Sequence, residues 1–331
     1  MKPIPEIEGT SPPHRERTCR SKPTLDVTTG RDFFRQVIGY TEQFRDSPLL
    51  KSLDRTSYPS SFCFHAETIE HGEQVGGGGG GKLLTPTFHF SILTEFLEVM
   101  NEQAEVLVEK LDKVGRARAP STASTTSPSV PSTSSVWVMD TTAAAMNWAI
   151  HLLGSIQRCR GRFKQELQEV VSDRPVNTED LKKLRYLECV IKESLRLFPS
   201  VPFFARSIGE DCHINGFKVP KGANAIILTY SLHRDPRHFP QPEEFRPERF
   251  MPENCVGRHP YAFIPFSAGL RNCIGQRFAM MEEKVILASI FRYFNVEACQ
   301  KREDIRPLGS SFFAPRRASG SNLRRGSSSS R

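Results

Sequence analysis

Apolar residues recur along much of the chain at the spacing of an α-helix. The clearest stripe lies in residues 88–113, where Phe96, Met100 and Leu107 share one side and charged residues fill the other. A stripe with this period is typical of a helix that buries one face. The same pattern predicts further helices over residues 30–44, 140–154, 178–198 and 276–294.

Capping residues mark the ends of two of these helices. Asp140 and Thr141 precede an alanine-rich stretch that closes at Gly154, the usual order of a polar N-cap and a C-terminal glycine. The next helix starts at Thr178 and ends before Pro199, because proline cannot continue a helix. Its apolar stripe has no break, so we predict one continuous helix.

A small β region interrupts the helices. Asn215-Gly216 is a dipeptide typical of a tight hairpin turn, and Ala225–Leu228 reads as a buried strand. Residues 61–70 favour another short strand, and the Pro-rich, charged residues 234–260 predict an ordered meander. The fold class is therefore mostly α with a small β region.

Low-complexity stretches divide the chain into segments. The six glycines of 76–81 form a flexible linker, and Lys82-Leu83 does not complete a phosphate-binding loop. Segments expected to be linkers or disordered are 1–24, 76–81, 115–135 and the basic tail 310–331. Segments expected to be structured are 25–75, a remnant of an N-terminal helix and strand, the helix of 82–114, and the core of 136–309.

Charge is concentrated at the C-terminal end. The net charge is +8, and residues 301–331 hold eight Lys/Arg and two Asp/Glu. A basic tail could bind nucleic acid or anionic lipid. The tail has almost nothing to bury, which favours a solvated end. We therefore expect no nucleic-acid partner.

The eight cysteines show no CxxC spacing, and no signal peptide opens the chain. This favours free thiols in a reducing compartment over disulfides or a zinc site. No run of about 18 apolar residues is present, so no membrane-spanning segment is expected.

One cysteine has unusual surroundings. Cys273 lies between Gly269 and Gly275 and directly before a predicted helix, whose N–H groups and dipole favour a thiolate. A nucleophile would need a positioned histidine, and zinc would need more ligands. A single thiolate beside Arg271 suits haem iron, whose propionates are anionic. An inert buried thiol remains the alternative.

The stretch "FSAGLRNCIG" resembles the haem-binding loop of the cytochrome P-450 family at the positions that define that loop. These positions are Phe266, Gly269, Arg271, Cys273 and Gly275.

Two further motifs support the resemblance. Glu193 and Arg196 in "ESLR" and Arg249 in "PERF" match the family's Glu-Arg-Arg cluster, which locks the core and the meander beneath the haem. Such Glu-x-x-Arg spacing alone is common on helices. Here the motifs follow the family's order and spacing, and "DTT" at 140–142 resembles its oxygen-activating helix motif.

Within the family, the chain is most similar to the family-four branch of fatty-acid ω-hydroxylases, specifically its V subfamily. "KLLTPTFHFSILTEFLEVMNEQA" and "LKKLRYLECVIKESLRLFPSVPFFARS" carry this closer likeness. The resemblance covers residues 30–53, 82–113 and 139–308.

The resemblance implies a haem-thiolate monooxygenase of lipid metabolism on the cytosolic face of the endoplasmic reticulum membrane. Such enzymes take electrons from NADPH through a reductase, split dioxygen and hydroxylate a fatty acid. The cofactor is haem b, with iron. The implied roles are proximal iron ligand for Cys273, propionate binding for Arg271 and Arg206, proton relay for Asp140 and Thr141, and substrate lining for Phe203 and Phe204.

The chain also departs from its relatives. The membrane anchor is expected to be missing, and glycines are expected to replace the segment before "KLLTPTF" and a linker the distal helices between 114 and 136. Trp137-Val138-Met139 stands where relatives have Glu-Gly-His, so Val138 replaces a glycine that leaves room for dioxygen. The final strands past Gly309 are also expected to be absent. We therefore expect an incomplete cytochrome P-450 fold.

These departures leave a second hypothesis open. The chain is then a catalytically inactive fragment, or the product of an imperfect gene model, that keeps only the proximal haem-binding half.

Overall fold

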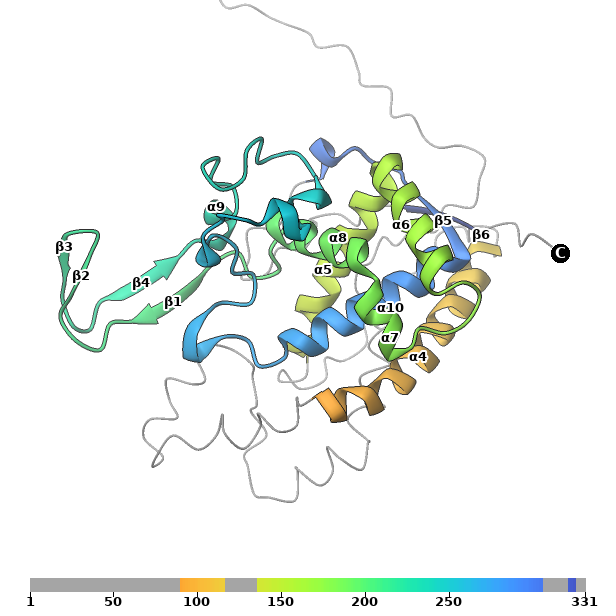
Figure 1. Ribbon diagram of the computed structural model, residues 1–331, viewed down its shortest axis with the longest axis horizontal. Coiled ribbons are helices and arrows are strands. Elements are labelled where there is room, and N and C mark those ends of the chain that lie inside the picture. The colour runs from red at the N-terminus through yellow and green to blue at the C-terminus, as the bar shows by residue number, and fades with distance from the viewer. Residues whose placement is uncertain (1–89, 117–135, 306–320, 326–331) are drawn as a thin grey trace, which may run out of the picture.

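The computed structural model describes residues 90–116, 136–305 and 321–325 (Figure 1). Several expectations lie outside the described residues: those for 1–24, 25–75 with its helix at 30–44 and strand at 61–70, 76–81, and 117–135.

The helix α5 (Val136–Ser155) runs through the middle of the molecule (Figure 1). Every residue from Thr142 to Gly154 is buried. A helix that is apolar on all sides is typical of a core element. The helices α8 (Arg185–Leu197) and α10 (Gln276–Tyr293) pack against α5, and α4 (Phe90–Arg116) packs against α10.

Three predicted helices are confirmed with shifted ends. The first turn of α5 begins at Val136 rather than at Asp140. The end of α4 reaches Arg116, two residues into the expected linker. The last residue of α10 is Tyr293, because Phe294 is already extended and opens a strand.

The prediction of one helix over 178–198 is wrong, because the chain breaks at Leu184. The short helix α7 (Thr178–Lys183) has a capping box built by Asn177 rather than a Thr178 cap. At the break, the carboxylate of Glu166 accepts the first N–H groups of α8, at 2.6 Å from Tyr186 and 2.9 Å from Leu187. Glu166 belongs to α6 (Gln157–Val170), so the signal for this second start is not local.

The helix α10 buries charge as well as apolar surface. Glu282 and Glu283 are 6% and 2% exposed. Burial raises the pKa of Glu282 to about 7, and burial with the adjacent Glu282 charge raises the pKa of Glu283 well above its usual value. The Lys284 ammonium bonds the Glu188 carboxylate at 2.8 Å and so links α10 to α8.

Two small sheets project from the helices (Figure 1). The strands β1 (Phe204–Ser207) and β4 (Asn224–Ile227) pair antiparallel, as do β2 (Cys212–Ile214) and β3 (Phe217–Val219). The predicted hairpin turn is confirmed, with positive φ at both Asn215 and Gly216. The expectation of a buried strand is wrong: Ile226 is 63% exposed, because β4 pairs within the described chain with β1 alone.

A third sheet corrects the expectation for the basic tail. The strand β5 (Phe294–Ala298) pairs antiparallel with β6 (Ser321–Arg325), so residues 321–325 are neither disordered nor lost. Leu323 lies opposite the fully buried Val296 and packs against the core. Composition did not predict this strand, because the stretch is basic and rich in serine. The single apolar side chain of Leu323 packs it against the core.

The predicted meander is ordered as short turns. It follows the single-turn helix α9 (Thr229–Leu232), and its 3-10 turns are η3 (Pro247–Phe250), η4 (Pro252–Asn254) and η5 (Pro260–Ala262). Beyond it lie η6 (Gly269–Arg271) and η7 (Arg302–Asp304). The fold class, mostly α with a small β region, is confirmed. None of the described helices is both long and apolar enough to cross a membrane.

We predict that Gly154→Ala destabilises the protein, because the new Cβ would lie 2.9 Å from the backbone nitrogen of Ala298. The expected loss in the free energy of unfolding is about 1–3 kcal/mol, measured by urea denaturation. In the control Gly161→Ala, the new Cβ meets nothing within 4 Å, so helix propensity should stabilise by about 0.5–1 kcal/mol. Equal stabilisation by both alanines would contradict this close approach of α5 to β5.

Candidate active site

A tight loop presents Cys273 at the start of α10. The Cys273 N–H donates to the Phe266 carbonyl at 2.9 Å, and the Ser267 N–H donates to the Ile264 carbonyl at 3.1 Å. The φ angles of Ser267 and Gly269 are +61° and +78°. Glycine occupies this left-handed conformation without strain, which accounts for Gly269. The loop therefore closes on itself through its own backbone.

The surroundings of the Cys273 thiol do not favour a thiolate in the protein alone. Cys273 is exposed, yet enough protein surrounds the sulfur for desolvation to raise the pKa of its thiol. A hydrogen bond from the Gly275 backbone opposes this shift and is outweighed. The expectation of a lowered pKa is thus wrong for the protein alone. Coordination by a metal would lower the pKa of this thiol, because a coordinating thiol is deprotonated.

Two arginines lie against this loop. The Arg206 guanidinium on β1 donates to the Ser267 hydroxyl at 2.7 Å and to the Arg271 carbonyl at 3.2 Å, and it covers the Phe204 ring. Arg271 is exposed, and its side chain forms no ion pair with the described residues. Guanidinium groups recognise carboxylates by paired hydrogen bonds, so this corner suits an acidic ligand.

These residues fit a haem. No three His, Cys, Asp or Glu side chains converge on a metal position anywhere in the described chain. A metal at Cys273 would take one ligand from the described residues, as haem iron does from its thiolate side. A Cβ at Gly275 would lie 3.9 Å from the Cys273 sulfur, in ordinary van der Waals contact with it. The adjacent arginines match the propionates.

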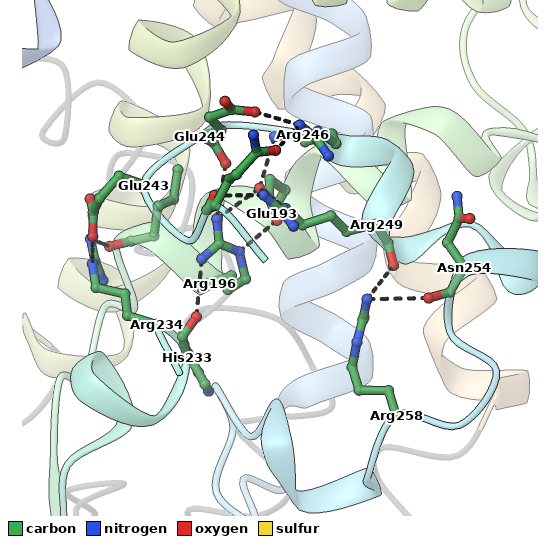
Figure 2. A network of polar contacts seen from close by, with 12 residues as sticks. Glu193, Arg196, His233, Arg234, Glu243, Glu244, Arg246, Arg249, Asn254 and Arg258 are labelled. Carbon is green, nitrogen blue, oxygen red and sulfur yellow. Dashed lines mark hydrogen bonds and ion pairs between the residues drawn. The ribbon is translucent and has the colours of Figure 1, made fainter. Parts of the chain in front are cut away.

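A polar cluster with a buried ion pair at its centre joins α8 to the meander (Figure 2). Glu193 and Arg196 are both completely buried, and the guanidinium binds the carboxylate through two hydrogen bonds of 2.8 and 2.9 Å. Arg249 approaches the same carboxylate at 3.4 Å, without hydrogen-bond geometry. The structure thus brings together the three residues of the Glu-Arg-Arg motif.

Backbone groups of His233 and of the meander complete the cluster (Figure 2). Arg196 also donates to the carbonyls of His233 at 3.0 Å and Glu244 at 3.1 Å. The Glu193 carboxylate accepts the Arg246 N–H at 2.8 Å. The buried Glu193–Arg196 pair on α8 therefore also binds the meander.

Sequence analysis missed His233. This fully buried residue accepts the Ile264 N–H on its ring Nε2 at 2.9 Å. Burial and the nearby Arg196 lower the pKa of His233 to about 3. Nothing in the surrounding "SLHRDP" distinguishes a buried acceptor from a surface histidine.

The remaining candidates are spread over α5 and β1. Thr141 is half-buried, and its carbonyl accepts the Ser200 hydroxyl at 2.7 Å. Asp140 precedes it on α5. Phe204 lies beside Arg206, whereas Phe203 is 45% exposed just before β1. Proton relay and substrate lining stay predictions for these four residues.

Comparisons with known proteins agree with this site. The family model "Cytochrome P-450" matches residues 138–318. "Cytochrome P-450 4V2" of Homo sapiens is 36% identical over 470 aligned positions, which cover 95% of this chain and 88% of the relative. Its Mus musculus namesake is 64% identical over 178 residues, which cover 53% of this chain and 34% of the relative.

Solved structures show the same fold. The crystal structure of a cytochrome P-450 titled CYP102L1 matches with a TM-score of 0.54 and 27% identity. The match covers 57% of this chain and 43% of that one. The human alignment is also longer than the 331 residues of this chain, so much of the relative has no counterpart here. The expected fold, a cytochrome P-450 fold that is incomplete, is confirmed.

We predict that Glu193→Gln lowers the free energy of unfolding by about 3–5 kcal/mol, because it leaves buried arginine charge without a counter-ion. Urea denaturation measures the change. The control Glu179→Gln removes an exposed i,i+3 partner of Lys182 and should leave the midpoint unchanged. If both variants unfold at similar urea concentrations, the buried Glu193–Arg196 pair does not stabilise the fold.

We also predict that stability falls as the pH is lowered from 6.5 towards 3. In this window the unfolded chain protonates His233 and the folded chain does not, so acid favours unfolding. The loss attributable to His233 is about 2 kcal/mol between pH 7 and pH 5. His151, with its pKa lowered to about 4 by burial, adds a similar loss. Urea denaturation at both pH values should show a smaller loss in His233→Gln, and an identical loss would contradict the assignment.

Proposed function

This chain belongs to the cytochrome P-450 family, whose cofactor is haem b held by a cysteine thiolate, and we propose that it is a monooxygenase that hydroxylates fatty acids at the ω position. The observation that carries the proposal is that the exposed Cys273 belongs to a loop that contains Arg271 and is bound by the Arg206 guanidinium. One thiol and two arginines in this loop region would suit one iron and two propionates.

In this proposal, Cys273 would hold the iron and Arg271 and Arg206 would bind the propionates. Phe266, Gly269 and Gly275 would shape the loop around the sulfur. The haem, when bound, supplies the chemistry of dioxygen activation with two electrons. The cluster of Glu193, Arg196 and Arg249 would keep the loop in place from behind.

Proton delivery would fall to α5. Asp140 directly precedes the half-buried Thr141 on this helix, and a carboxyl and a hydroxyl in this order would serve to pass protons inward. The Thr141 carbonyl accepts the Ser200 hydroxyl, which ties this part of α5 to the segment that follows α8. The haem-binding core of the proposal is residues 136–309.

The substrate and partners follow from similarity to the family-four branch. Phe203 and Phe204 would offer apolar surface to a hydrocarbon chain, which suits a fatty acid. Electrons would come from NADPH through a cytochrome reductase on the cytosolic face of the endoplasmic reticulum membrane.

A second function is favoured by two specific observations. Val138 stands at the position where the resemblance implies a glycine, and the fold match covers 43% of the solved chain. Under this alternative, the chain keeps the proximal half and lacks hydroxylase activity. The two functions differ only in whether the distal side of the haem site can bind dioxygen and substrate.

We predict that the purified chain with added haem gives the red-shifted Soret band of a thiolate-ligated, reduced carbon-monoxide complex. Cys273→Ser should abolish this band, because serine supplies no thiolate. The control Cys299→Ser removes another exposed thiol and should retain it. Absence of the band in the parent chain would contradict haem binding through Cys273.

Activity then separates the two functions. The monooxygenase proposal expects NADPH-dependent ω-hydroxylation of a fatty acid when the haem-loaded chain is mixed with reductase. A normal thiolate band without any hydroxylated product would favour the inactive fragment.

A further inference from the structure

His233 lies at the junction of two structures described above (Figure 2). It directly follows α9 and is completely buried. Its backbone carbonyl accepts a hydrogen bond from Arg196 at 3.0 Å, and its ring Nε2 accepts the Ile264 N–H at 2.9 Å. One residue thus contacts both the buried cluster and the segment that leads into the cysteine loop.

A short path continues from Ile264 to Cys273. The Ile264 carbonyl accepts the Ser267 N–H at 3.1 Å, so both backbone polar groups of Ile264 are engaged. The Phe266 carbonyl, two residues on, accepts the Cys273 N–H at 2.9 Å. Two successive turns of chain therefore connect the Cys273 backbone to the His233 ring.

The loop has a second anchor of a different kind. Arg206 reaches the loop from β1 and binds the Ser267 hydroxyl and the Arg271 carbonyl. That anchor joins the loop to a projecting sheet. The His233 bond instead joins the loop to the rigid core.

We propose that His233 is a positioning residue that couples the Glu193–Arg196 ion pair to the cysteine loop through the hydrogen bond from Ile264 to its ring. The proposal deepens the proposed function, on which it rests for the role of the thiol. In this proposal His233 acts through the loop and does not contact the haem or the substrate.

The ring is suited to accept rather than donate at Nε2. A protonated imidazole has no lone pair for the Ile264 N–H. Burial, Arg196 and Arg234 all lower the pKa of His233, so the ring stays neutral. The proton then resides on Nδ1, for which the described residues provide no partner with hydrogen-bond geometry. The Phe263 ring, with its centroid 5.0 Å from that of the imidazole, fixes the ring plane.

The test compares three replacements of His233 in the full-length chain. Gln can place an amide oxygen near the position of Nε2, whereas the shorter Asn reaches only the position of Nδ1. Phe keeps the ring and its packing but removes the acceptor. The matched control is His151→Phe, at another completely buried histidine that is not bonded to the loop.

The first readout needs no haem. Hydrogen–deuterium exchange is followed in peptides covering 262–275, with peptides from α4 and α6 as internal references. We expect about three- to ten-fold faster exchange of the loop in His233→Phe and His233→Asn, the range expected from losing one hydrogen bond. We expect His233→Gln to exchange like the parent and His151→Phe to leave the loop unchanged relative to α4 and α6.

The second readout is the reduced carbon-monoxide spectrum of the haem-loaded variants. A less well-held thiol should lower the fraction of thiolate-type complex in His233→Phe and His233→Asn, with recovery in His233→Gln. If the parent lacks the band, the proposed function fails, while the exchange data still decide the role of His233.

Three results would overturn the proposal. The first is loop exchange that is unchanged in all variants. The second is exchange that rises equally in α4, α6 and the loop, which indicates loss of global stability alone. The third is a Gln variant that behaves like Asn, which excludes an acceptor at the Nε2 position. If Phe fails to fold, the comparison of Gln with Asn decides alone.

Discussion

A glutamate and an arginine can leave water together only if every polar atom they carry finds a partner. Glu193 and Arg196 are completely buried, so this condition governs how the surrounding chain must lie. Arg196 requires the carbonyls of His233 and Glu244, and Glu193 requires the backbone N–H of Arg246. Neighbouring helices could pack in several ways, but few arrangements satisfy this pair. The His233 ring, which accepts the Ile264 N–H, extends the same constraint towards the cysteine loop.

The candidate site depends on the same region of the chain. The loop backbone is closed by its own hydrogen bonds and is held by Arg206 and His233. Burial raises the pKa of the Cys273 thiol. In the proposed function the protein would supply the position of the ligand, and the iron would supply the ionisation.

Sequence analysis identified what depends on local pattern and on short motifs. It located α4, α5 and α10, the turn at Asn215-Gly216 and the residues that surround Cys273. It failed where a distant residue decides the local structure. Glu166 caps α8 from another helix, and His233 becomes an acceptor only because Ile264 folds onto it. Exposure of β4 and the pKa of Cys273 depend on packing that no window of sequence contains.

The pairing of β5 with β6 shows how little sequence can specify a strand. Alternation along β6 gives the core side to Leu323, the apolar residue of a segment otherwise made of serine, asparagine and arginine. A slip of one residue would turn Leu323 towards solvent and direct an arginine inward against Val296. The register of the whole strand is therefore encoded by one side chain. Its fidelity rests on the cost of that single misplaced charge rather than on many small preferences along the strand.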